Sequence, residues 1–359
     1  MREYTLLMQE WMFRKPGCQP EIIDLPHTWN AIDGQDGGND YWRGCCEYEK
    51  HFDGPKYNKE SQCVYIQFEG VNSSADVFLN GKELIHHDGG YSTFRAEITD
   101  YLYEKDNVLI VKVDNGVNDR VYPQKADFTF YGGIYRDVSL IVLEKNHFSL
   151  DYLGGPGIEV VAQISEDNLD ECLVNVKVFI TGTGVPVIKI LDAEDKVVGK
   201  PCEGANVSFK ILNPHLWNGR KDPYLYKAQA ELLDANGETL DFIEINFGIR
   251  TFKADAQKGF YLNGKPYPLY GVSRHQDRKG IGNAITKEMH EEDMNLIKEM
   301  GCNSIRLAHY QHDQYFYDLC DKEGMIVWAE IPYISEHMPN GRENTISQMK
   351  ELITQNLNH

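Results

Sequence analysis

Three apolar segments in the carboxyl-terminal part of the chain lead into polar side chains that could do chemistry. The segments are residues 267–272, 302–307 and 325–330. The polar residues are Arg274, His275 and Asp277 for the first, Arg306 and His309 for the second, and Glu330 and His337 for the third. If the segments are parallel strands, their carboxyl ends meet at one edge of a sheet. Guanidinium, imidazole and carboxylate groups gathered there predict a functional pocket at that edge.

Two simpler explanations compete with this pocket. Arg306 and Glu330 could form a buried structural ion pair while the histidines satisfy backbone groups. Alternatively, His275, His309 and His337 could hold a metal ion, since imidazole is a common ligand. No two histidines have the His-x-x-x-His spacing that places two ligands on one helix face, so the sequence does not favour the metal site.

Helical periods separate the apolar segments. The first helix is expected to begin after Thr286 and to end at Gly301, with Met289, Leu296, Ile297 and Met300 facing inward. The second is expected to open at Asp313 and stop at Gly324, with Phe316, Leu319 and Cys320 facing inward. A third helical segment runs from about 346 to 357. Three successive βα units predict a parallel sheet, which is either open or the first part of a closed barrel.

The chain before these units reads as two blocks of β-strands. Val64, Ile66 and Phe68 alternate with polar or amphipathic residues, as in a half-buried strand, and Asn80-Gly81 supplies the residues of a type I′ hairpin turn. Further strands are expected at 108–113 and 138–143, so the stretch to about residue 147 fits an antiparallel sandwich. No helix follows Gly89-Gly90 or Gly132-Gly133, which excludes a phosphate-binding glycine loop, and no serine-nucleophile elbow is present.

The second block contains six runs with strand character, and about seven short strands over roughly 100 residues are typical of an immunoglobulin-like sandwich. The runs are residues 158–164, 172–180, 185–191, 207–212, 226–233 and 240–247.

Composition narrows the class of protein. The 359 residues are 42% hydrophobic and carry a net charge of −19, so we expect packed domains and neither nucleic acid nor a membrane surface as partner. No apolar run approaches a membrane span and the amino terminus lacks the apolar core of a signal peptide, so we expect a soluble cytoplasmic protein. Eight scattered cysteines without a Cys-x-x-Cys pair predict free thiols and no zinc site.

The run Asn303-Ser304-Ile305-Arg306-Leu307-Ala308-His309-Tyr310, followed by Asp321 and Gly324-Met325-Ile326-Val327, resembles the first signature of glycoside hydrolase family 2. This family includes β-galactosidases, β-glucuronidases and β-mannosidases. The family usually has proline after His-Tyr, where this chain has Gln311. The resemblance covers the whole chain.

Other runs are similar to further parts of the family. The entry of its barrel is similar to Asn263-Gly264-Lys265-Pro266 with Gly271-Val272-Ser273-Arg274-His275, and its immunoglobulin-like domain is similar to Phe247-Gly248-Ile249-Arg250 with Leu216-Trp217. The end of its jelly-roll sugar-binding domain is similar to Gly132-Gly133-Ile134-Tyr135-Arg136-Asp137-Val138. The resemblance implies a jelly-roll domain over 1–147, an immunoglobulin-like sandwich over 148–253 and the first three βα units of a (β/α)8 TIM barrel over 254–359.

The resemblance also implies roles for single residues. Asp127 falls where β-galactosidases place an aspartate that contacts the sugar, sometimes with a bound sodium ion, and Asp40 lies in a loop similar to one that supplies a polar sugar contact. Arg306 would steady the site electrostatically and His309 would donate hydrogen bonds to sugar hydroxyls. His275, Asp277, Glu330 and His337 would line the same pocket.

Retaining glycosidases need two carboxylates about 5 to 5.5 Å apart. In this family both glutamates lie on later strands, beyond an Asn-His pair that resembles Asn358-His359. The resemblance therefore implies an amino-terminal β-galactosidase fragment that is inactive alone, needs no cofactor for its own residues, and belongs to an enzyme with magnesium and sodium sites.

Arg274-His275 and Asp127 favour galactose over glucuronate or mannose. The alternatives are a β-glucuronidase or β-mannosidase of the same family, or a non-catalytic carbohydrate-binding fragment. We expect a carbohydrate partner and a homo-oligomer. Because the third strand would expose an apolar edge, we also expect self-association or local disorder in the part after about residue 260.

Overall fold

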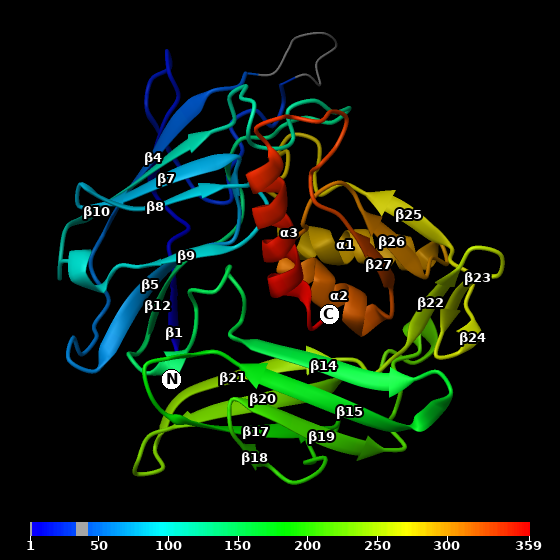
Figure 1. The fold of residues 1–359 in the computed structure, drawn as a ribbon. Helices are drawn as coiled ribbons and strands as arrows, with labels where there is room; N and C mark the ends of the chain where they lie inside the picture. The colour runs from blue at the N-terminus through cyan, green and yellow to red at the C-terminus, as the bar shows by residue number, and fades with distance from the viewer. Residues whose placement is uncertain (1, 34–41) are drawn as a thin grey trace.

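A computed structural model describes residues 2–33 and 42–359, which form two β-sandwiches and a small parallel sheet packed on helices (Figure 1). The predicted combination of a jelly-roll sandwich, an immunoglobulin-like sandwich and three βα units is confirmed. The domain boundaries at 147 and 253 stay predictions, although the strand at 147–148 already pairs within the second sandwich.

The first sandwich consists of two antiparallel sheets. The four-stranded sheet contains, in spatial order, β1 (Glu3–Leu6), β12 (Val138–Glu144), β5 (Gln62–Phe68) and β9 (Phe94–Glu97). The six-stranded sheet contains β3 (Glu21–Ile23), β2 (Trp11–Arg14), β4 (Cys45–Phe52), β10 (Asn107–Asp114), β7 (Ser74–Leu79) and β8 (Lys82–Asp88). A short pair of β6 (Val71–Asn72) and β11 (Gly133–Ile134) and a 3-10 turn at Thr99–Tyr101 complete it.

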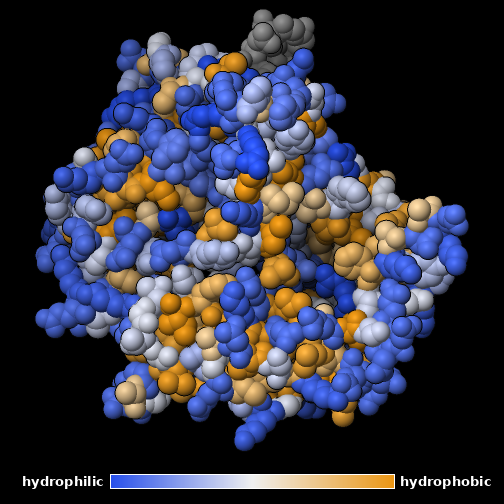
Figure 2. Space-filling model, in the orientation of Figure 1, coloured by the Kyte–Doolittle hydropathy of each residue, from blue (hydrophilic) through white to orange (hydrophobic). Residues whose placement is uncertain are grey.

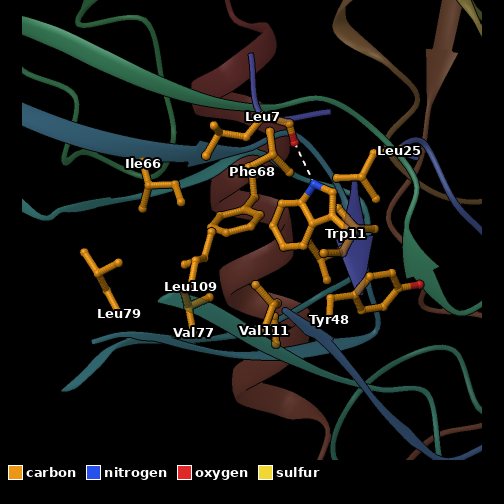
Figure 3. Close-up of a cluster of buried hydrophobic side chains, with 14 of the residues drawn as sticks. Leu7, Trp11, Leu25, Tyr48, Ile66, Phe68, Val77, Leu79, Leu109 and Val111 are labelled. Carbon is orange, nitrogen blue, oxygen red and sulfur yellow. Dashed lines mark hydrogen bonds between the residues drawn. The ribbon is translucent and has the colours of Figure 1, made fainter. Parts of the chain in front are cut away.

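The core of this sandwich is filled by large apolar side chains from both sheets (Figure 3). Trp11 is fully buried there and its indole nitrogen donates to the carbonyl oxygen of Leu7 at 2.8 Å. A buried indole N–H needs such a partner. Asn80 and Gly81 have φ angles of 51° and 78° and join β7 to β8, as the hairpin prediction required.

Strand β5 is buried on both faces, and the prediction of a half-buried strand is wrong. Val64 belongs to the main core, whereas Tyr65 is 1% exposed and packs with Ile141 and Leu150 in a second apolar cluster. The physical reason is that the chain around Leu150 covers the face that a lone sandwich would leave to solvent.

The second sandwich is antiparallel throughout and encloses its own apolar core. One sheet contains β14 (Ile158–Ser165), β15 (Asn168–Val178) and β19 (Asn206–Leu212), and the other contains β18 (Cys202–Glu203), β17 (Val185–Leu191), β20 (Tyr226–Leu233) and β21 (Thr239–Phe247). Two further strands, β13 (His147–Phe148) and β16 (Ile180–Thr181), form a separate pair, and a 3-10 turn covers Gly219–Lys221.

The last part begins with a small antiparallel sheet and continues with the three βα units. The antiparallel sheet contains β22 (Phe252–Asp255), β23 (Gly259–Leu262) and β24 (Lys265–Pro266). The parallel sheet contains β25 (Gly271–Arg274), β26 (Ser304–Leu307) and β27 (Ile326–Ala329), with α1 (Lys287–Glu299), α2 (Gln314–Glu323) and α3 (Arg342–Asn356) following them in turn. Asp313 caps α2 by accepting from the backbone of Tyr315, and Gly324 ends it at φ 72°, as predicted.

Two local predictions are wrong. The first parallel strand starts at Gly271, opposite Ser304, and not at Tyr267, because Pro268 lies in the preceding run and has no N–H to give to a ladder. On α1 the predicted inward residues Leu296 and Met300 are 53% and 69% exposed.

The buried residues of α1 are instead His290, Met294 and Ile297. The helix is rotated because Arg274 of the sheet bonds to His290 and Asp293, which draws that polar side of the helix inward.

Helix α3 buries a polar stripe, not an apolar one. Asn344, Gln348, Glu351 and Gln355 are buried against the first sandwich, which α3 flanks in Figure 1. Gln355 bonds to both the N–H and the carbonyl oxygen of Thr93, at 3.0 and 2.9 Å, and Glu351 accepts from His87 and Ser92. The helix therefore joins the βα units to the first sandwich by hydrogen bonds.

The apolar side of α3 and the outer strand β27 are exposed. Met349, Ile353 and Leu357 are 40%, 53% and 37% exposed, and Trp328 of β27 is 69% exposed. Figure 2 shows apolar side chains gathered in the middle of this face, where Figure 1 places α3 and β27. The exposed edge agrees with expectation, while self-association stays a prediction.

All eight cysteines are free thiols. Among the described residues, no helix is both long enough and apolar enough to cross a membrane.

Candidate active site

Arg306, His309 and Glu330 form one cluster at the carboxyl ends of β26 and β27. Arg306 donates to Glu330 through two nitrogens, Nε to Oε1 at 2.6 Å and Nη2 to Oε2 at 3.1 Å. The Nδ1 atom of His309 lies 3.1 Å from both Arg306 Nη2 and Glu330 Oε2. The predicted convergence of these two strand ends is present in the structure.

The alternation of side chains along β26 and β27 explains why Arg306 and Glu330 face away from the helices. Arg306 pairs with Ser273 on one side and Trp328 on the other, whereas its neighbours Ile305 and Leu307 are buried among the helices. Alternate residues of a strand point to opposite faces. Arg306 and Glu330 therefore lie on the face that the helices leave uncovered.

The cluster lines an open cavity of about 460 Å³ between β27 and α3. Its lining comprises Arg306, His309, Glu330, Ile331, Tyr333, Ile334, Thr345 and Met349. The side chains of Arg306, Glu330 and His309 are 42%, 18% and 16% exposed, so the ion pair is only partly buried. The ion pair of the simpler explanation is therefore present, but it is only partly buried and it lines the cavity.

A loop of the first sandwich reaches this edge of the sheet. The Phe128 ring stacks on the His309 ring, with centroids 5.5 Å apart at 12°, and lies 5.0 Å from that of His275. Asp127, the residue before Phe128, is exposed. The loop therefore brings Phe128 against the strand-end histidines, with Asp127 next to it in the chain.

His275 lies between the sheet and this loop. Its Nδ1 atom is 3.3 Å from the hydroxyl of Tyr310, and its ring is 5.2 Å from that of His309. Burial lowers the pKa of His275 below its ordinary value, and the carboxylates of Asp277 and Asp127 oppose this shift. His275 is therefore neutral at pH 7 and can accept or donate one hydrogen bond at each nitrogen.

The remaining predicted residues are placed at different depths. Asp277 is exposed and accepts from the hydroxyl of Tyr131 at 3.1 Å. His337 is exposed and its Nδ1 lies 3.2 Å from the hydroxyl of Tyr333, which lines the cavity, whereas His337 itself does not. Asp40 lies outside the described residues.

Arg274 is on the opposite face of the sheet and does not reach the cavity. It donates to Asp293 at 2.6 Å, lies 3.1 Å from ring nitrogens of both His290 and His312, and sits 3.9 Å above the ring of Phe316. Burial lowers its pKa, and Asp293 opposes that shift. Arg274 holds the helices on the sheet and is not a sugar-contacting residue in this geometry.

The sodium site expected at Asp127 concerns an exposed carboxylate on the loop before Phe128. In residues 2–33 and 42–359 no group of three or more His, Cys, Asp or Glu side chains is placed to hold a metal ion. The sodium and magnesium ions both stay predictions, and no step is derived through either.

Sequence reasoning missed Phe128, Tyr310, Tyr333 and Met349. Phe128 directly follows Asp127, so its place in the sequence was the available signal. Tyr310 stacks on Tyr91 of the first sandwich with centroids 4.3 Å apart. No periodicity marks such contacts, because they depend on how the sandwich docks.

Gln311, which replaces the family's usual proline, is more than a turn residue. Its carbonyl oxygen accepts from Arg136 at 3.0 Å and its amide donates to Gln355 at 2.8 Å. Arg136 also donates to Tyr91, so the motif around Gly133 anchors the first sandwich to the sheet. A side chain at Gly133 would meet the carbonyl oxygen of His27 at 2.2 Å, and its φ of 146° favours glycine.

Comparison with known proteins gives three matches along the chain. Residues 34–144 match the model described as the sugar binding domain of glycosyl hydrolases family 2, residues 154–250 match a second model of that family, and residues 254–358 match its TIM barrel domain.

Individual relatives match all or nearly all of the chain. A β-glucuronidase of Bacteroides fragilis is 40% identical, with 100% of this chain and 55% of that protein covered. A β-galactosidase of Thermoanaerobacter pseudethanolicus is 30% identical, with 94% and 46% covered. The chain spans about half the length of the curated relatives it matches.

Solved structures agree with the fold. An FMN-binding β-glucuronidase from Faecalibacterium prausnitzii L2-6 has a TM-score of 0.95 at 40% identity, covering 100% of this chain and 57% of that one. A β-glucuronidase of Bacteroides uniformis has a TM-score of 0.90 at 33% identity, covering 100% and 46%.

Proposed function

The chain belongs to glycosyl hydrolase family 2, and on that premise we propose that it is the sugar-binding amino-terminal part of a retaining β-glycosidase. The observation that carries the proposal is the Arg306–His309–Glu330 cluster at the strand ends, open to a cavity of about 460 Å³. Active sites of (β/α)8 enzymes lie at the carboxyl ends of the strands.

His309 is the sugar-contacting residue in this proposal. Its Nδ1 atom is held by Arg306 and Glu330, and no described residue hydrogen-bonds to Nε2. If Nδ1 accepts from Arg306, Nε2 carries the proton and donates to a sugar hydroxyl; if Nδ1 donates to Glu330, Nε2 accepts. Phe128 stacks on the same ring and holds its plane. The cluster thus presents one oriented imidazole edge to the substrate.

Arg306 and Glu330 orient this imidazole and set the charge beside it. A bidentate guanidinium–carboxylate pair is geometrically specific, so it fixes both side chains. The guanidinium would also offset negative charge that builds on the departing oxygen in the transition state. Neither residue supplies the acid/base or nucleophile, which the family carries on later strands.

The substrate we propose is a terminal β-D-glucuronide, with a β-D-galactoside second and a β-D-mannoside third. The glucuronidase names of relatives at 40% identity support this order. The galactoside, which the sequence placed first, is supported by relatives at 30% identity. A cytoplasmic location and a homo-oligomer are further parts of the proposal.

Hydrolysis of chromogenic β-D-glucuronide, galactoside and mannoside tests the proposal. The 359-residue chain is assayed beside a version extended by the carboxyl-terminal part that the longer relatives carry. We expect turnover only by the extended version, fastest on the glucuronide. Sugar binding by the extended version without turnover would favour a non-catalytic carbohydrate-binding protein. Turnover by the short chain that Glu330→Gln abolishes would overturn the assignment of both carboxylates to later strands.

A further inference from the structure

A second cavity of about 430 Å³ lies between the two sandwiches and shares no lining residue with the strand-end cavity. Its lining comprises Arg2, Tyr4, Arg95, Pro156, Ile158, Phe242, Ile243 and Glu244. In the first sandwich these residues come from β1, the residue before it and β9. In the second they come from β14, the chain before it and β21. The volume lies within the range of small-molecule sites.

Arg95 is the unusual group in this cavity, because it is a partly buried cation that forms no ion pair with a described carboxylate. Its Nε donates to Gln67 at 2.6 Å, and its Nη1 donates to the carbonyl oxygens of Leu150 and Gly155 at 3.3 and 2.9 Å. Among the described residues, no carboxylate forms an ion pair with it and no acceptor is bonded to Nη2. Buried charges in proteins are usually paired, so this guanidinium keeps unused binding capacity.

Burial lowers the pKa of Arg95 to about 10, so it stays charged at pH 7. The carboxylates of Glu69 and Asp151 oppose this shift without a hydrogen bond to Arg95, and they accept instead from Gln67 and Tyr65. The protein around it carries a net charge of −19. Although the protein is acidic overall, no described Asp or Glu side chain forms an ion pair with Arg95.

Arg2 adds a second guanidinium to the same cavity. Its side chain pairs with the buried Asp241 at 2.9 Å, so its charge is balanced, and Tyr4 lines the cavity beside it in the chain. Among the described residues, Glu244 is the acidic residue that lines the cavity, and its side chain is exposed. Glu244 forms no ion pair with Arg95 among the described residues, so the Nη2 atom of Arg95 stays available to a ligand.

The apolar wall of the cavity is formed mainly by Pro156 and Phe242, which are partly exposed, because Ile158 and Ile243 are buried in the core of the second sandwich. We propose that this cavity binds a small organic acid, whose carboxylate is held by Arg95 with help from Arg2 and Tyr4 and whose apolar part lies on that wall. A carboxylate accepting from a guanidinium forms a strong charge-assisted hydrogen bond. The site stands on its own contacts and does not rest on the proposed glycosidase activity.

Binding is tested by calorimetric titration of the full 359-residue chain at constant ionic strength. The probes are benzoate, its neutral counterpart benzamide, and inorganic phosphate. We expect saturable binding of benzoate, with benzamide weaker by roughly tenfold because it cannot form the charge-assisted bond. Phosphate, which has no apolar part, is expected to bind more weakly than benzoate.

Three variants separate the site from general charge effects. Arg95→Gln should weaken benzoate binding by roughly tenfold or more. Glu244→Gln should tighten it by about two- to threefold, since it removes a repelling charge at an exposed position. Arg14→Gln is the matched control, because it removes the same charge from an exposed pair with Glu47 and Glu49 outside the cavity, and it should change nothing.

Equal binding of benzoate and benzamide, or unchanged benzoate binding by Arg95→Gln, would overturn the proposal. Phosphate binding as tight as benzoate would overturn the role of the apolar wall. If Arg95→Gln does not fold, Glu244→Gln decides the question: tighter benzoate binding supports the site, and unchanged or weaker binding rejects it.

Discussion

Two arginines on neighbouring strands of one sheet have different surroundings. Arg274 of β25 is 6% exposed and meets Asp293, His290 and His312 beneath the helices, whereas the Arg306 side chain of β26 is 42% exposed and meets Glu330 and His309 at an open cavity. Both clusters contain an arginine, a carboxylate and histidine. The same residue types thus form a buried structural cluster around Arg274 and a cavity-lining cluster around Arg306.

Register decides between the two outcomes. Arg274 pairs with Leu307 and Arg306 pairs with Ser273, so the two arginines point to opposite faces. Burial then sets the protonation state of the histidines. It lowers the pKa of His290 to about 4 and lowers the pKa of His312 well below its ordinary value, so both rings stay neutral beside the Arg274 charge. A cluster of reactive residue types therefore marks a site only when its face is open.

The largest expected contrast is in stability. Arg274→Met should lower the free energy of unfolding by roughly 3 kcal/mol or more, because it removes a buried charge from Asp293 and strips two histidines of a partner. Arg14→Met, at an exposed pair, should cost less than about 1 kcal/mol. Urea unfolding followed by circular dichroism measures both. Equal losses of unfolding free energy in Arg274→Met and Arg14→Met would contradict the role of Arg274 as a buried structural residue.

Glu330→Gln should separate function from stability on the open face. In the extended protein we expect kcat/KM to fall by roughly 100-fold, since Arg306 and His309 lose the group that orients them. Unfolding should change by less than about 1.5 kcal/mol because the pair is partly exposed. Glu330→Asp should restore part of kcat, and Glu323→Gln, an ion-paired glutamate at the end of α2, should leave kcat unchanged. A large loss of stability with unchanged kcat would show that the Arg306 cluster is structural, like the Arg274 cluster.

Phe128→Ala tests whether the sandwich loop belongs to the open cluster. Loss of the stacked ring should raise KM by several-fold, equivalent to about 1 kcal/mol, because His309 is no longer held in its plane. Phe252→Ala removes a stacked, exposed ring from β22 and should leave KM unchanged. A matching rise in KM for both variants would show a nonspecific effect.

The smallest expected effect is a titration. His275 should titrate below pH 6.5 in the folded chain, and Asp277→Asn should lower that midpoint further, because the carboxylate favours the charged ring. Since the folded pKa is lowered, the unfolded state binds more protons as pH falls through 6.5, and stability decreases there. Imidazole proton resonances report the midpoint. A midpoint above 6.5 would contradict the burial of this ring.

The alternation and turn signals of the sandwiches were predictable because they are local. Strand β20 lies at Tyr226–Leu233, the range that its apolar pattern predicts, and Asn80-Gly81 turns as expected. Arg306, His309 and Glu330 were found because residues at the carboxyl ends of parallel strands must meet. What the sequence could not indicate is which face an arginine takes, since that depends on pairing partners far away in the chain.

Helix α3 shows the same limit. Its inward residues Asn344, Gln348, Glu351 and Gln355 are polar, so hydrophobic periodicity could not identify the buried side. Their partners, such as Ser92 and Thr93, lie about 260 residues earlier. Only the docking of the first sandwich makes that stripe an interior surface.

This polar stripe also has a consequence for the order of assembly during synthesis. The first sandwich ends near Glu144 and α3 begins at Arg342, so at 5–20 residues per second roughly 10 to 40 seconds separate their emergence from the ribosome. The sandwich can fold in that interval, so His87, Ser92 and Thr93 are already in place when α3 emerges. The helix then docks on hydrogen-bonding groups that already have fixed positions, and the later half of the chain is organised by the earlier one.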